Sequence, residues 1–360
     1  MKNISIKILS ALCIIALSYD AMAGNKDRTG QGAAPEMLIN PWAQSTGIFG
    51  QDVGYVSGVE AMKSNIAGLA LVEKSDIGLS HGIYLTGTNI SINNLAIAQK
   101  LGNAGVVGVN IMSVGFGDIT MTDYYNPEGF GTYHPQFLNV ELGFAKEFSN
   151  KIHAGVAVTY VSEQVTNIAA LGLAFEGGVQ YVTGKRDNFH FGITLRNLGT
   201  NMHFSGPGFS IDGENPQSTP SIPVTTQYPS DKFDMPTYLN IGASYDVFLD
   251  ENHRSSDSTP KHRLSIIADF QSNTFINDYL GGGLEYGFNN MFMVRAGYRY
   301  ENGIGNPASS QTIYVGFAAG ATIQTRLGAK GPMLAFDYSY RPTDRPANGV
   351  HMFSLRFMRK

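Results

Sequence analysis

The strongest constraint on the fold is a two-residue alternation of apolar and polar side chains, which recurs from about residue 76 to the end of the 360-residue chain. In the clearest segments every second side chain is apolar: Leu264, Ile266, Ala268, Phe270; Phe292, Val294, Ala296, Tyr298, Tyr300; Leu334, Phe336, Tyr338, Tyr340; and Phe353, Leu355, Phe357. Successive side chains of a β-strand point to opposite faces, so each segment has one apolar and one polar face. Segments of about ten residues with tyrosines near their ends are more typical of a transmembrane β-barrel than of a soluble sandwich.

The amino terminus has the pattern of a secretory signal peptide. A basic start is followed by an apolar stretch at 8–17 and by the small-x-small sequence Ala21-Met22-Ala23 before Gly24. The apolar stretch is too short to span a bilayer as a helix, which takes about 20 residues. We therefore predict a signal peptide at residues 1–23, cleaved between Ala23 and Gly24, and an exported chain that is either periplasmic or a barrel.

Composition narrows the possible functions. Charged residues make up 15% of the chain, against about 25% in globular proteins, and low charge suits a wall that faces lipid. The net charge of −4 gives no support for a nucleic-acid partner. The only cysteine, Cys13, lies in the predicted signal peptide, and the sequence has no HExxH, GxSxG or P-loop motif. We predict that the protein is not an enzyme and uses no metal or cofactor.

The alternation predicts an all-β fold, a fourteen-stranded antiparallel transmembrane β-barrel. The expected strands are 76–85, 90–101, 105–115, 136–148, 152–164, 169–183, 189–199, 236–249, 262–272, 278–288, 291–301, 311–325, 332–341 and 349–358. Short turns such as Asn289-Asn290 alternate with longer loops, notably 116–135 and 200–235. In such barrels short turns face the periplasm and long loops face outside, so the carboxyl terminus is predicted to be periplasmic.

Residues 24–75 lack the strand alternation and are predicted to be separate from the barrel at 76–360. One interpretation is a periplasmic tail. The other, which we prefer, is a hatch that packs in or beneath the lumen, because a barrel of this size lies between a filled eight-stranded barrel and an aqueous porin.

If the apolar faces contact lipid, the charged residues of the other faces point into the lumen. The predicted polar network of the lumen consists of Asp269, Glu285, Arg295, Arg299, Asp337 and Arg356, with Glu141, Arg196 and Asp246 assigned to the same face. Glu285 is expected beside Arg295, and Asp337 beside Arg356. Such pairs favour a filled interior, and a conduction or ligand site is the alternative.

The two long loops are rich in aromatic residues. The candidate partner-binding residues are Tyr124, Tyr125, Phe130, Tyr133, Phe204, Phe209, Tyr228 and Phe233. Exposed aromatic side chains on loops often anchor a partner protein. They could equally fold over the mouth of the barrel and pack on each other, and the sequence does not decide between the two.

Several short segments resemble a known family. They are Gly50-Gln51-Asp52-Val53-Gly54, Asn65-Ile66-Ala67-Gly68-Leu69-Ala70, Lys74-Ser75-Asp76-Ile77-Gly78-Leu79-Ser80-His81, Ala174-Phe175-Glu176-Gly177-Gly178-Val179-Gln180-Tyr181 and Gly283-Leu284-Glu285-Tyr286, leading to Ala296-Gly297-Tyr298. Together they resemble the PorV/PorQ family of outer-membrane proteins of the type IX secretion system, which are related in fold to FadL fatty-acid transporters. At one position the chain differs from the family, because Ile66 stands where the family usually has proline.

The resemblance implies a FadL-like barrel with no chemistry of its own in the outer membrane of a Bacteroidota cell, with gliding motility as a possible associated process. PorV-like proteins cap the giant translocon barrel. They also bind the carboxyl-terminal domain of exported cargo and pass the cargo to the cell-surface attachment (sortase) complex. PorQ-like proteins belong to that complex. The expected partners are therefore the translocon or the attachment complex, cargo domains and membrane lipids. A FadL-like transporter of hydrophobic small molecules is the alternative, and it predicts an apolar pocket inside the barrel.

Overall fold

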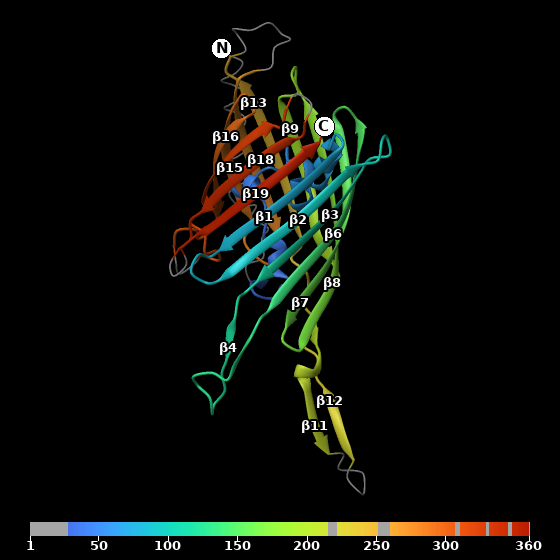
Figure 1. Cartoon of the computed structure of the whole chain (residues 1–360), viewed down its shortest axis with the longest axis vertical. Helices are drawn as coiled ribbons and strands as arrows, with labels where there is room; N and C mark the ends of the chain where they lie inside the picture. Colours follow the sequence, from blue (N-terminus) through green and yellow to red (C-terminus); the bar gives the residue numbers. More distant parts are fainter. Residues whose placement is uncertain are drawn as a thin grey trace.

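Fourteen antiparallel strands close into a barrel in the computed structural model, which describes residues 28–214, 222–250, 260–306, 310–328, 331–344 and 348–359 (Figure 1). The predicted signal peptide and its Ala23–Gly24 cleavage site lie outside these ranges. The first and last strands pair from Ser75 opposite Arg359 to Ile83 opposite His351. Within the described wall, closure leaves no strand edge free, so the backbone polar groups of the wall pair within the sheet, as a membrane interior requires.

The wall follows chain order. Its strands are β1 (Ser75–Tyr84), β2 (Ile90–Lys100), β3 (Val106–Gly115), β6 (Gln136–Ser149), β7 (Ile152–Val165), β8 (Ile168–Thr183), β9 (Phe189–Gly199), β13 (Tyr238–Phe248), β14 (His262–Asn273), β15 (Tyr279–Phe288), β16 (Phe292–Glu301), β17 (Phe317–Arg326), β18 (Met333–Arg341) and β19 (Val350–Arg359). The short strand β10 (Phe204–Ser205) adds to the end of β8. The predicted fold class is confirmed.

The strand boundaries agree with the prediction to within two residues, except at the start of one strand. We predicted a strand from residue 311, but β17 begins at Phe317. Gly316, with a φ of +86°, interrupts the extended backbone before it. Before it, the Tyr314 ring packs edge-on against Phe49 with ring centres 5.4 Å apart, whereas its neighbours Ile313 and Val315 are exposed. The prediction was wrong there because Gly316 breaks the extended backbone, so that only an isolated bridge between Tyr314 and Thr343 precedes β17.

The outer face of the barrel is apolar. Along β1, for example, Ile77, Leu79 and Ile83 are exposed, whereas the residues between them are mostly buried. The same alternation on the other strands exposes a continuous apolar surface far larger than the few hundred Å² usual for soluble monomers. Such a surface supports location in the outer membrane.

The two ends of the barrel differ, as Figure 1 shows. One end, here called the short-turn end, has tight turns such as Asn289-Asn290, where both residues adopt positive φ (53° and 52°). At the other, the long-loop end, two hairpins extend beyond the wall. One contains β4 (Ile119–Met121) and β5 (Gly131–Tyr133), and the other contains β11 (Ser210–Glu214) and β12 (Pro223–Gln227).

Residues 33–72, here called the inner segment, lie within the barrel. Their short helices are η2 (Pro35–Leu38), α2 (Ala43–Thr46), η3 (Gly58–Lys63) and η4 (Ile66–Leu71). The fully buried Trp42, Met62 and Leu69 belong to an apolar cluster shared with wall residues such as Ala96 and Ala145. The inner segment therefore fills much of the lumen with a packed core.

Wall glycines let the inner segment approach closely. A β-carbon added to Gly192 of β9 would lie 2.2 Å from the carbonyl oxygen of Val53, and one added to Gly297 of β16 would lie 2.8 Å from the α-carbon of Ile48. Backbone is in contact with backbone at both positions, so no side-chain rotation can make room. The absence of side chains at these sites is a steric condition for docking.

We expect Gly192→Ala to weaken docking of the inner segment by about 1–3 kcal/mol, the usual range for overpacking. Gly177→Ala on the neighbouring strand is the matched control, because an added β-carbon there meets nothing within 4 Å. Trp42 is the only tryptophan and is fully buried, so its fluorescence during urea titration measures docking. Equal urea midpoints for the two variants would contradict the packing described here.

Candidate functional site

Ion pairs join the inner segment to the wall. Lys63 lies 3.4 Å from Glu141 of β6, and both side chains are buried. Farther along the wall, Arg356 of β19 lies 3.3 Å from Glu60 and 3.6 Å from Asp337 of β18. Removing one partner of such a pair leaves an uncompensated buried charge, which typically costs about 3–5 kcal/mol. These pairs therefore fix the position of η3 relative to the wall.

A second group of buried charges lies within the wall. Glu285 accepts from Arg295 at 2.8 Å and from Arg263 at 2.6 Å. On β8 and β9, Glu176 and Arg196 pair at 2.6 Å. These pairs neutralise charge on neighbouring strands and leave a lumen without a dominant sign.

The structure brings some of the predicted lumen residues together and separates others. Glu285 meets Arg295, and Asp337 meets Arg356, at the distances given above. Asp269 is buried but forms no ion pair among the described residues, and Arg299 contacts aromatic rings instead of a carboxylate. The sequence interpretation missed Glu60 and Lys63 as lumen charges. The sequence feature that could have identified them is their position next to the apolar residues Val59, Ala61 and Met62, which are buried with them.

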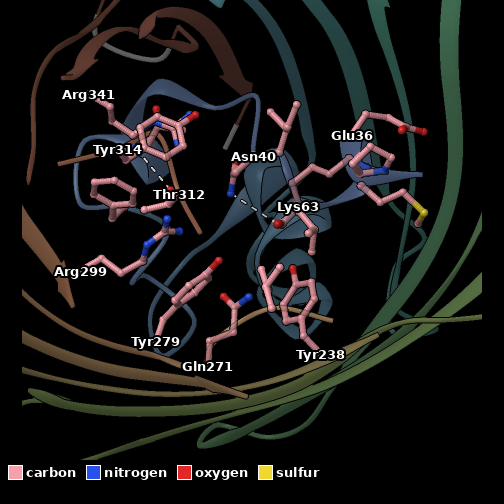
Figure 2. Close-up of a pocket in the computed structure, with 18 of the residues that line it drawn as sticks. Glu36, Asn40, Lys63, Tyr238, Gln271, Tyr279, Arg299, Thr312, Tyr314 and Arg341 are labelled. Atoms are coloured by element: carbon pink, nitrogen blue, oxygen red, sulfur yellow. Dashed lines mark hydrogen bonds between the residues drawn. The ribbon is translucent and has the colours of Figure 1, made fainter. Parts of the chain in front are cut away.

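A cavity of about 490 Å³ lies between the inner segment and the wall at the long-loop end. Figure 2 shows Arg299, Arg341, Tyr279 and Tyr314 on one side of it. Another part of its lining is apolar and includes Ile90, Val114, Phe116 and Phe137. The Tyr314 hydroxyl donates to the Tyr84 hydroxyl at 3.2 Å and so connects the two parts. The volume falls within the about 300–1,000 Å³ of small-molecule sites.

Burial and a neighbouring charge shift one acid in the lining of this cavity. Glu36 of η2 is buried, and this burial, together with the negative charge of Glu163, raises its pKa from 4.5 to about 8. Removal from water disfavours the charged form of a carboxyl group. Burial therefore favours the neutral form of Glu36 in the folded protein.

The predicted partner-binding residues fall into two groups. Tyr124 and Tyr125, at the tip of the β4–β5 hairpin, are 92% and 86% exposed, and Phe130 and Tyr228 are also exposed. By contrast, Phe204 and Phe233 are partly buried and pack on each other, with ring centres 5.7 Å apart, against a core that includes Met202 and Met235. Tyr133 and Phe209 are intermediate in exposure. The packing alternative thus holds for Phe204 and Phe233, while partner binding by the exposed residues stays a prediction.

None of the helices in the described ranges combines the length and apolar character needed to cross a membrane. The described residues also contain no group of three or more histidine, cysteine, aspartate or glutamate side chains positioned to hold a metal ion.

Comparison with solved structures identifies the fold. The chain is similar to the Ralstonia pickettii toluene transporter TbuX (15% identity, 92% of this chain and 99% of that chain, TM-score 0.52) and to the Pseudomonas putida toluene transporter TodX (13%, 92% and 98%, TM-score 0.55). The monoaromatic hydrocarbon channel CymD gives 12% identity, 90% and 98% coverage and a TM-score of 0.54. Neither a protein-family model nor a curated protein matches the sequence. The barrel is FadL-like, and its neighbours are transporters and channels.

The raised pKa of Glu36 predicts how docking depends on pH. Between pH 4.5 and about 8, Glu36 keeps its proton in the folded state but has lost it in the unfolded chain. The contribution of Glu36 to stability therefore falls as pH rises through this window. Glu36→Gln cannot ionise, so the variant should gain stability relative to the wild type between pH 5 and pH 8.5, as read from the Trp42 urea midpoint. The exposed Glu128→Gln variant is the control. A stability difference between Glu36→Gln and the wild type that does not change with pH would contradict this assignment.

Proposed function

We propose that the protein is a non-enzymatic component of a type IX secretion system that binds protein partners at the long-loop end of its barrel. In this role it caps a translocon barrel, or it binds the carboxyl-terminal domain of exported cargo and passes the cargo to a surface attachment complex. The long-loop end then faces outward and the carboxyl terminus faces the periplasm. The resemblance of several segments to the PorV/PorQ family supports the proposal.

The observation that carries the proposal is the pair of hairpins beyond the barrel wall (Figure 1). At the tip of the first, Tyr124 and Tyr125 stack edge-on, with ring centres 5.3 Å apart, while remaining almost fully exposed. In the second, Ile211, Val224 and Tyr228 are exposed. Large apolar side chains gathered on a projecting element are costly in water and are typical of protein-binding surfaces.

The filled lumen also favours a binding role over a wide channel. The inner segment is packed against the wall and held by buried ion pairs between Lys63 and Glu141 and between Arg356 and Glu60. A wide aqueous path would require this segment to leave, with the loss of those pairs. Partner binding at the hairpins requires no such rearrangement.

Transport of hydrophobic small molecules is a second candidate, and the cavity at the long-loop end favours it. The structural neighbours TbuX and TodX are toluene transporters, and CymD is a hydrocarbon channel. At 12–15% identity this likeness carries the fold and not the substrate. Uptake of labelled toluene into proteoliposomes that depends on this protein would favour transport over partner binding.

We expect the double variant Tyr124→Ser/Tyr125→Ser to recover at least about ten-fold less partner than the wild type, because central aromatic residues of an interface contribute about 2 kcal/mol or more. The measurement is quantitative mass spectrometry of proteins that copurify in mild detergent from the native outer membrane. Glu128→Ser changes an exposed, non-aromatic residue of the same hairpin and is the control. Undiminished recovery of a translocon or sortase component by the tyrosine variant would contradict the proposed role of this hairpin, and the absence of any such component with the wild type would contradict the type IX assignment.

A further inference from the structure

Charged side chains are distributed unequally between the two ends of the barrel. At the long-loop end, residues 116–135 contain three acidic residues but no lysine or arginine. At the short-turn end, the part of the wall from β6 to β9 carries Lys146, Lys151 and Lys185. The electrostatic field of this arrangement attracts an anion to the short-turn end of these strands.

All three lysines lie on the outer face of the wall or at its rim. Lys146 has the same parity along β6 as the exposed Phe144 and points outward with it, because the side chains of a strand alternate between its faces. Lys151 lies in the β6–β7 turn and Lys185 in the β8–β9 turn, and both are exposed. The backbone N–H of Val182 donates to the carbonyl oxygen of Lys151 at 2.8 Å, so the two turns are adjacent. The three ammonium groups therefore belong to one stretch of the rim.

The protein supplies little negative charge on this surface. None of the three lysines forms an ion pair with a carboxylate of the described residues. Glu147 follows Lys146 in the chain but points to the opposite face of β6. In the β8–β9 turn, Asp187 is the single carboxylate, and Arg186 lies over the ring of Phe248 with 5.1 Å between its central carbon and the ring centre. Three lysines therefore share one carboxylate, and positive charge remains uncompensated.

Exposed apolar side chains adjoin these lysines on the outer face. Phe148, near the end of β6, is 69% exposed, and the exposed residues Ile152 and Tyr181 are opposite each other in the register of β7 and β8. Apolar and aromatic side chains at the end of a transmembrane strand contact the boundary between acyl chains and headgroups. A lysine beside them lays its methylene groups along the apolar surface and places its ammonium group in the headgroup layer.

We propose that the short-turn rim between β6 and β9 binds a monoanionic phospholipid of the phosphatidylglycerol class. Its phosphate pairs with the ammonium groups of Lys146, Lys151 and Lys185, and its acyl chains lie against Phe148 and the neighbouring outer face. A zwitterionic phospholipid has the same phosphate, but its own ammonium group neutralises that charge, so it gains less from the lysines. The site is independent of partner binding by the hairpins, which extend from the opposite end of the barrel (Figure 1).

The test is native mass spectrometry of the purified protein in a neutral detergent, titrated with an equimolar mixture of phosphatidylglycerol and phosphatidylcholine that have identical acyl chains. Wild-type protein should bind phosphatidylglycerol at least about ten-fold more tightly than phosphatidylcholine. A lysine near an anionic lipid contributes a factor of about five, so Lys151→Gln and Lys185→Gln should each weaken phosphatidylglycerol binding about five-fold, and Lys146→Gln/Lys151→Gln/Lys185→Gln at least about ten-fold. Lys232→Gln removes an exposed lysine at the long-loop end and is the matched control, which should bind as the wild type does.

Folding of each variant is checked by Trp42 fluorescence and by heat-modifiable gel mobility. The lysines form no ion pair within the described structure, so the urea midpoints of the glutamine variants should match that of the wild type. The proposal is overturned if the folded triple variant keeps wild-type affinity for phosphatidylglycerol, if phosphatidylcholine binds as tightly, or if Lys232→Gln loses as much affinity as Lys185→Gln. Displacement of phosphatidylglycerol by inorganic phosphate at an equal concentration would also overturn it, because the rim would then recognise a free anion and not a lipid.

Discussion

Charge neutralisation between the inner segment and the wall is the constraint on which the rest of the structure depends. Glu60 and Lys63 are buried on η3, and each finds its counter-charge on a strand, at Arg356 and Glu141 respectively. Neither set of charges is tolerable alone in a water-poor lumen, so barrel and inner segment stabilise each other. Close contacts at glycines such as Gly192 and Gly297 then allow backbone to pack on backbone.

This coupling divides the lumen into a packed part and an open part. Around Trp42 and Met62 the inner segment fills the barrel, whereas at the long-loop end it leaves a cavity of about 490 Å³. Two hairpins extend beyond the wall at the same end (Figure 1). The FadL-like wall thus carries exposed aromatic residues such as Tyr124 on a projecting hairpin, and it encloses a cavity lined in part by Arg299 and Arg341.

The sequence predicted the wall well because each strand carries its own signal. Alternation and short turns depend on neighbouring residues, and the strand prediction failed chiefly near Tyr314, where a long-range contact with Phe49 overrides the local pattern. The interior was harder to predict for the same reason. Glu285 and Arg295 are neighbours across adjacent strands and could be paired from register, whereas the partners Lys63 and Glu141 are joined only by the fold. No local pattern distinguishes Arg341, which forms no ion pair with a carboxylate of the described residues.

The central claim, that the inner segment is docked in the lumen, is tested most directly by a disulfide cross-link. The hydroxyl oxygens of Thr46 on α2 and Ser339 on β18 lie 2.7 Å apart, and the only native cysteine, Cys13, lies in the predicted signal peptide. Thr46→Cys/Ser339→Cys should form a disulfide in the native outer membrane on mild oxidation, seen as a mobility shift reversed by reductant, while each single variant should not. Free thiols in the double variant that react readily with a membrane-impermeant maleimide after oxidation would contradict the docked position.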